Sequence, residues 1–128
     1  MMGTGYDIFL DNNKIGVTAF EKADAPMGVV FGKINFINIG SGYSFFKEYC
    51  SKNKIDVNDY PEDRVILTRD IPALRVFNSS GIEVKGLGCS VSGMDSDIFE
   101  ICIEGIPYPF YEDEFPHHVE TYNNMFNK

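Results

Sequence analysis

The sequence has no tryptophan, only three cysteines and two histidines, and no long hydrophobic run. Cys50, Cys89 and Cys102 are odd in number and lack C-x-x-C spacing, which predicts free thiols in a reducing compartment. A membrane-spanning helix needs roughly 18 uninterrupted apolar residues, and no such stretch occurs. The first residues also lack the basic and apolar regions of a secretion signal. These absences predict a cytoplasmic protein that does not bind a membrane.

Hydrophobic and aromatic residues are abundant by contrast. The chain has 128 residues, of which 44% are hydrophobic and 14% aromatic, with eleven Phe and seven Tyr. This length is typical of one domain, here residues 1–128, and is sufficient to bury a core without a metal or a disulfide. The composition excludes a disordered acidic tail and a fibrous repeat.

Positive charge is almost missing from the last third of the chain. The formal net charge is −8, and residues 90–128 hold eight acidic residues against one basic residue, Lys128. Nucleic-acid affinity comes largely from Lys and Arg side chains that neutralise phosphates, so direct DNA or RNA binding is disfavoured. A basic protein is the complementary partner. The alternative is that the acidity serves only solubility.

The hydrophobic periodicity predicts an α+β fold with a mainly antiparallel sheet and two amphipathic helices. The helices are expected over about 42–52, with Ser41 as the N-cap, and over about 115–126. Residues 53–63 are expected to form a polar connector. Strands are expected over 6–10, 15–20, 29–31, 34–39, 65–67, 74–77, 82–85 and 99–104. The expected core includes Phe46, Tyr49, Phe99, Ile101, Ile103, Val119, Tyr122 and Phe126.

Few patterns in the sequence indicate catalysis or metal binding. His117 and His118 are adjacent, and neighbouring side chains on a helix point about 100° apart, so they rarely share a metal ion. Residues 94–97 lack the glycine and the distant glutamate of a calcium loop. Cys89 follows the expected turn 86–88, and only there could a loop lower a thiol pKa. We therefore predict no catalytic residue, no metal and no cofactor.

The segment 106–114 is the most unusual part of the sequence. It places three aromatic residues, Tyr108, Phe110 and Tyr111, beside three acidic ones, Glu112, Asp113 and Glu114. Two prolines favour an extended or turn conformation. Aromatic residues next to charge are typical of protein interfaces, so these six residues are the first candidates for partner binding. Second candidates are the other acidic residues nearby, Asp95, Asp97, Glu100 and Glu104. The alternative is that the aromatics cover one end of the sheet while the acids are merely solvated.

Several stretches, namely 14–16, 23–32 and 115–118, resemble those of small bacterial proteins of nearly this length. Small acidic α+β proteins of this type resemble the immunity proteins of interbacterial toxin systems, including contact-dependent inhibition. The resemblance is one of type and assigns no binding residue. It implies a protein that neutralises a cognate toxin, often a basic nuclease, by covering its active site or an adjacent surface.

Two other classes of function remain open. The chain could be a small hydrolase that uses His117 or His118 with a carboxylate from residues 112–114, although no nucleophile stands at a recognisable spacing. It could also be an adaptor that binds through a strand edge or through the proline-containing segment. On balance the sequence predicts a non-enzymatic immunity protein.

Overall fold

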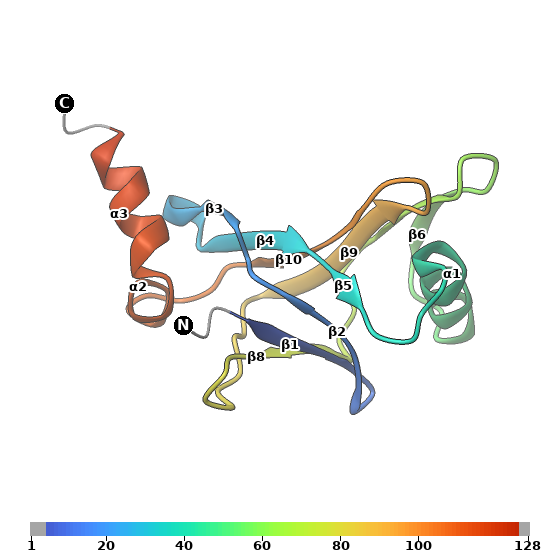
Figure 1. The fold of residues 1–128 in the computed structure, drawn as a ribbon, viewed down its shortest axis with the longest axis horizontal. Coiled ribbons are helices and arrows are strands. Elements are labelled where there is room, and N and C mark those ends of the chain that lie inside the picture. The colour runs from blue at the N-terminus through green and yellow to red at the C-terminus, as the bar shows by residue number, and fades with distance from the viewer. Residues whose placement is uncertain (1–4, 126–128) are drawn as a thin grey trace.

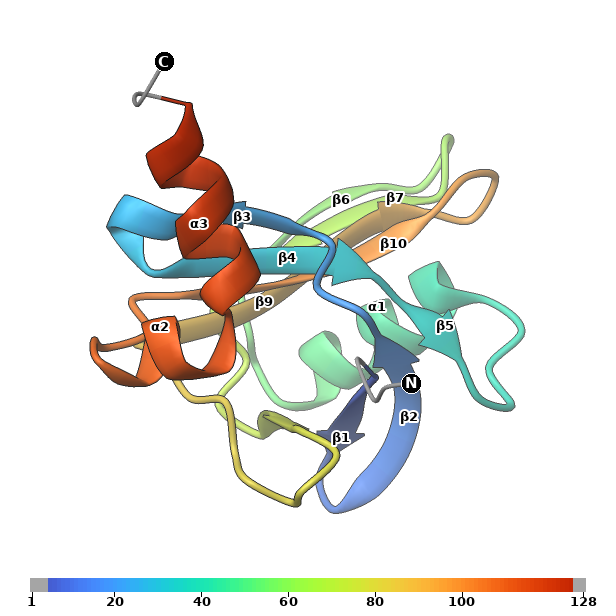
Figure 2. The ribbon, with the colours of Figure 1, turned by 60° about the vertical axis from the view of Figure 1, so that its left-hand side comes forward.

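The computed structural model describes residues 5–125, and it confirms the predicted α+β class. Two antiparallel sheets enclose the core (Figures 1 and 2). The smaller sheet has the order β5 (Asn35–Phe36), β2 (Asn13–Thr18), β1 (Tyr6–Leu10) and β8 (Leu74–Phe77). The larger sheet has the order β3 (Lys22–Asp24), β4 (Val29–Lys33), β10 (Phe99–Glu104), β9 (Gly88–Met94), β7 (Val65–Thr68) and β6 (Val57–Tyr60).

Alternation of apolar and polar residues explains how the two sheets form one core. Every second residue of β1 is buried, and the same holds along β10. Side chains of a strand point to opposite faces in turn, so each sheet buries one face against the other. The fully buried side chains include Phe20, Val30, Phe46, Ile66, Ile101, Ile103, Tyr111 and Phe115.

The helix α1 (Gly42–Lys52) confirms the prediction over 42–52. Ser41 is its N-cap and accepts a hydrogen bond from the Ser44 amide, as the sequence predicted. The helix packs on β6, β7 and β9 and buries Phe46 and Cys50, whereas Tyr49 is only half-buried. Its position beside the larger sheet is visible at the right of Figure 1.

The helix predicted over 115–126 is confirmed in position but is largely exposed, and a further short helix precedes it within 106–114, where an extended or turn conformation was expected. Helix α2 (Phe110–Glu114) ends before Phe115, and α3 (Pro116–Asn124) begins at Pro116. Proline disfavours helical geometry in the residue before it, and Phe115 has φ −123° and ψ 54°. Helix α3 contains no buried residue, so the expected burial of Val119 and Tyr122 was wrong. Phe126 lies outside the described residues.

Other predictions along the chain also need correction. Residues 57–60 of the expected connector form β6, and residues 82–85 make only one isolated bridge, between Phe77 and Glu83. Residues 88–90, expected in a turn and loop, form the first part of β9, which lies at the centre of the larger sheet. Its Ser- and Gly-rich sequence has low strand propensity. At Gly93, however, a β-carbon would lie 2.5 Å from Phe99 Cγ, so the packing of that ring requires a small residue.

Candidate functional site

The structure divides the predicted binding residues between two opposite ends of the molecule. Helices α2 and α3 lie at one end of the long axis, and the β6–β7 and β9–β10 turns lie at the other (Figure 1). Asp95 and Asp97 therefore lie far from Glu112 and Asp113. Glu100 and Glu104 lie between the ends, on the outward face of β10, and Glu100 pairs with Lys22 at 3.4 Å. The acidic last third of the sequence is thus not one continuous surface.

Three of the six first candidates are structural rather than free for a partner, and the first of these, Phe110, is partly buried and packs against the core. The Tyr111 side chain is fully buried, and its hydroxyl donates to the Val29 carbonyl oxygen at 2.9 Å. Glu114 is half-buried and accepts hydrogen bonds from the Tyr6 hydroxyl and the Asn78 amide, each at 2.9 Å. The prediction of Tyr111 as a surface anchor was therefore wrong. The two hydrogen bonds of Glu114 hold α2 against the smaller sheet.

Tyr108 lies at the surface and is nevertheless held in place. Its side chain is 48% exposed, its hydroxyl donates to the Ala25 carbonyl oxygen at 2.8 Å, and its ring stacks on Tyr111 with centroids 5.3 Å apart. Partial burial and then the charge of Glu112 raise the pKa of Tyr108. A tyrosine fixed in this way offers contact area without losing much freedom on binding.

The residues around Tyr108 form a surface that we call the tyrosine end, made of Asp24, Met27, Tyr108, Glu112 and Asp113. The 3-10 turn η1 (Ala25–Met27) lies against the segment before α2. The two segments are so close that a β-carbon at Gly28 would be 2.5 Å from the Ile106 carbonyl oxygen. Met27 is 67% exposed, and the three acids of this end are exposed. Within residues 5–125 they form no ion pair. Met27 and Asp24 were missed from the sequence because only the fold brings η1 beside Tyr108.

The opposite end, which we call the hairpin end, consists of the turns 60–64 and 94–97 with the adjoining residues Lys47 and Asp59. Arg64 Nε donates to Asp95 Oδ2 at 2.8 Å, and Lys47 pairs with Asp59 at 3.2 Å. Both cations are thus neutralised by acids of the same end, while Glu62, Asp63 and Asp97 stay exposed. Asp95, predicted to bind a partner, instead holds the turn 94–97 to helix α1.

The two histidines do not form a catalytic pair with a carboxylate. His118 Nε2 lies 2.7 Å from the Phe20 carbonyl oxygen, and a carbonyl can only accept, so this nitrogen carries a proton. Partial burial, and then His118, lower the pKa of His117. Both oxygens of Glu114 are engaged elsewhere. Glu114 is therefore not the carboxylate partner of either histidine.

The surroundings of the cysteines disfavour the thiolate form, which is the nucleophilic one. Burial raises the pKa of Cys89 and, followed by the charges of Glu104 and Glu100, raises the pKa of Cys102 to about 11. Cys89 is a strand residue and not the loop residue expected from the sequence. Across residues 5–125, no three His, Cys, Asp or Glu side chains gather where a metal ion could be held. Among the same residues, none of the helices has the length and apolar character needed to cross a bilayer.

Comparison with protein-family models, curated protein sequences and solved structures finds no match to this chain. The fold and its surfaces therefore carry the functional argument.

Proposed function

We propose that this protein is an immunity protein that binds and neutralises a cognate basic toxin through the tyrosine end. One observation carries the proposal. Tyr108 is half-exposed but fixed by a hydrogen bond and by stacking, and it lies beside acidic side chains that have no partner within residues 5–125. Such an arrangement combines a preorganised aromatic anchor with an unneutralised charged rim.

Charge supports a basic partner. The sequence contains no Lys or Arg between Lys85 and Lys128, so no cation of the tyrosine end's own segment 106–125 competes for its acids. A nuclease toxin must attract phosphate backbones and therefore carries basic residues near its active site. An acidic surface complements those residues, which speeds association and excludes nucleic acid from the same place.

The hairpin end supports this choice by contrast. Its cations, Arg64 and Lys47, are each paired with an acid of the same end. Its exposed aromatic residue, Tyr60, has no hydrogen bond to hold its ring among the described residues. Ordering that ring on binding costs entropy, which the tethered Tyr108 has already lost on folding.

The test is a binding and protection experiment with a cognate toxin, which is to be sought in the reading frames that neighbour this protein's gene. Glu112→Lys with Asp113→Lys should slow association, with an effect that fades as salt rises. Tyr108→Ala should instead speed dissociation. The loss of binding free energy should be about 2 kcal/mol, as is typical of a central anchor. Both variants should protect cells against the toxin less well than the parent protein. Glu114 is left intact because its hydrogen bonds support the fold.

The hairpin end provides the matched control. Glu62→Lys with Asp63→Lys makes the same charge change at the far end of the molecule, and it should leave association and protection unchanged. Equal loss in both double variants would mean that net charge alone drives binding. Loss in the control only would place the interface at the hairpin end. Full protection by every variant would refute the proposal.

A further inference from the structure

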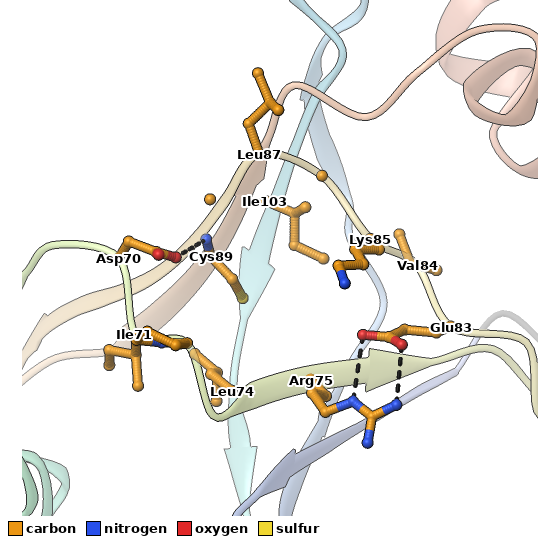
Figure 3. Close-up of a pocket in the computed structure, with 13 residues that line it drawn as sticks. Asp70, Ile71, Leu74, Arg75, Glu83, Val84, Lys85, Leu87, Cys89 and Ile103 are labelled. Atoms are coloured by element: carbon orange, nitrogen blue, oxygen red, sulfur yellow. Dashed lines mark hydrogen bonds and ion pairs between the residues drawn. The ribbon is translucent and has the colours of Figure 1, made fainter.

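A cavity of about 290 Å³ lies where the two sheets separate (Figure 3). One wall is the segment 82–88, which we call the strap, and the opposite wall is formed by residues 70–75. The strap is tied to both sheets, because the Val84 amide donates to the Val76 carbonyl at 2.8 Å and the Leu87 amide to the Glu104 carbonyl at 2.7 Å. Backbone hydrogen bonds therefore hold the strap side of the cavity to both sheets.

Gly86 allows the strap to lie this close to β10. A β-carbon at this position would be 2.1 Å from the Glu104 carbonyl oxygen, which no side chain can tolerate. The floor of the cavity is apolar and belongs to the core. It is formed by Ile71, Leu74, Val84 and Ile103, all of which are buried.

Opposite charges lie at the two sides of this floor (Figure 3). On one side, Asp70 Oδ1 accepts a hydrogen bond from the Cys89 amide at 2.9 Å, which orients the carboxylate. On the other side, Lys85 forms no ion pair within residues 5–125. The neighbouring Arg75 and Glu83 neutralise one another, with Nη2 to Oε1 at 3.0 Å, so Lys85 leaves that side with one net positive charge.

We infer that this cavity binds a small molecule with an ammonium and a carboxylate group separated by a short apolar chain, such as an ω-amino acid. The ligand's ammonium would pair with Asp70, its carboxylate with Lys85, and its methylene groups would cover the apolar floor. A ligand with a single charged group would leave one of the two protein charges without a partner. This inference is independent of the tyrosine end and of any toxin.

The probe is a series of ω-amino acids of increasing chain length, with 6-aminohexanoate at its centre. Hexanoate and hexylamine, each with one charged group, serve as matched ligands. Titration of the full-length protein followed by amide chemical shifts should show the amino acid binding about tenfold more tightly than either matched ligand. The largest shifts should fall on Cys89 and on the strap. An optimum at one chain length would report the distance between the two charges.

Two variants remove one charge each without changing shape. Asp70→Asn keeps an oxygen that can accept from the Cys89 amide, and it should remove the preference for the amino acid over hexanoate. Lys85→Met should remove the preference over hexylamine. Asp97→Asn and Lys52→Met make the same charge changes outside the cavity and should leave affinity unchanged.

Three results would overturn the inference. These are equal affinity for all three ligands, affinity that both cavity variants retain, and shifts that map outside the cavity. The fold of each variant is checked by its own amide spectrum, so a loss of binding by a folded variant can be assigned to the missing charge.

Discussion

Tyr108 and Tyr111 stack on one another, but only one of them can contact a partner. They are three positions apart, on either side of the start of α2, and their hydroxyls donate to the carbonyls of two segments, Ala25 and Val29. The Tyr111 ring is fully buried, whereas that of Tyr108 is half-exposed. A single residue type therefore serves as core at one position and as surface at the other.

At the residue scale we predict that Tyr111→Phe destabilises the protein by about 1 kcal/mol, because the hydrogen bond to the Val29 carbonyl is lost inside the core. Urea unfolding measures this loss. Tyr60→Phe is the control. Tyr60 is 53% exposed, so this variant should change the free energy of unfolding by only a few tenths of a kcal/mol. Toxin binding by Tyr111→Phe should be unchanged. An unaltered urea midpoint would show that the hydrogen bond contributes nothing.

At the scale of elements, Asp95 joins the β9–β10 turn to the beginning of α1. Its carboxylate accepts from the Ser41 hydroxyl at 2.6 Å, from the Tyr43 amide at 3.0 Å and from Arg64 Nε at 2.8 Å. Arg64 also donates to the hydroxyls of Ser41 and Ser44. A negative charge at a helix N-terminus is stabilising, so this network fixes α1 against the larger sheet.

The Asp95 network should make stability depend on pH. Burial raises the pKa of Asp95, but the hydrogen bonds from Ser41, Tyr43 and Arg64 lower it by more, so the net shift is downward. A lowered carboxyl pKa stabilises the fold above the unfolded value, about 3.9, and this contribution is lost as pH falls through the folded value. Asp95→Asn should therefore lower the urea midpoint at pH 7 and have a smaller effect near pH 2.

Asp97→Asn is the control for this prediction. Asp97 belongs to the same turn but is exposed, and its side chain forms no ion pair among the described residues. Its urea midpoint should follow that of the parent at both pH values. If Asp95→Asn lowered the urea midpoint equally at pH 7 and pH 2, the carboxylate charge would not be the cause of the lost stability.

At the scale of the whole molecule, the first strand of the chain is joined to the segment around helix α2, more than 100 positions later in the sequence. The Tyr6 hydroxyl of β1 donates to Glu114 of α2, and the Tyr6 ring lies 5.0 Å from that of Phe20 and 5.6 Å from that of Phe115. Burial, followed by the hydrogen bond and the charge of Glu114, raises the pKa of Tyr6 above its ordinary value. Burial, followed by Tyr108 and Asp24, raises the pKa of Tyr111 to about 12.

These tyrosines should make the protein sensitive to alkali. A raised pKa means that the native state favours the neutral phenol, so the stabilisation is complete below the unfolded value of about 10 and is lost as pH rises above it. Circular dichroism and tyrosinate absorbance, measured together, should show unfolding accompanied by ionisation of the buried phenols. Tyr6→Phe should weaken the dependence above pH 10. Full ionisation of all tyrosines before unfolding would contradict the prediction.

The sequence by itself determined the elements whose signals are local. Strand-forming residues along 6–10 predicted β1, alternation along 99–104 predicted β10, and Ser41 followed by helical spacing predicted α1. These features depend on residues close together in the chain, for which propensity and periodicity are sufficient. The aromatic and acidic composition of 108–113 also located one part of the candidate surface.

Only the tertiary structure decided which residues share a surface. Strand β9 has a weak local signal and forms because β10 and β7 pair with both of its edges. Glu114 and Tyr111 turn inward because Tyr6, Asn78 and Val29 lie within hydrogen-bond reach. The turn η1 joins Tyr108 through the Ala25 carbonyl oxygen, 83 positions away in the sequence. Such contacts come from pairing and packing between distant segments, and a pattern read along the chain carries no information about them.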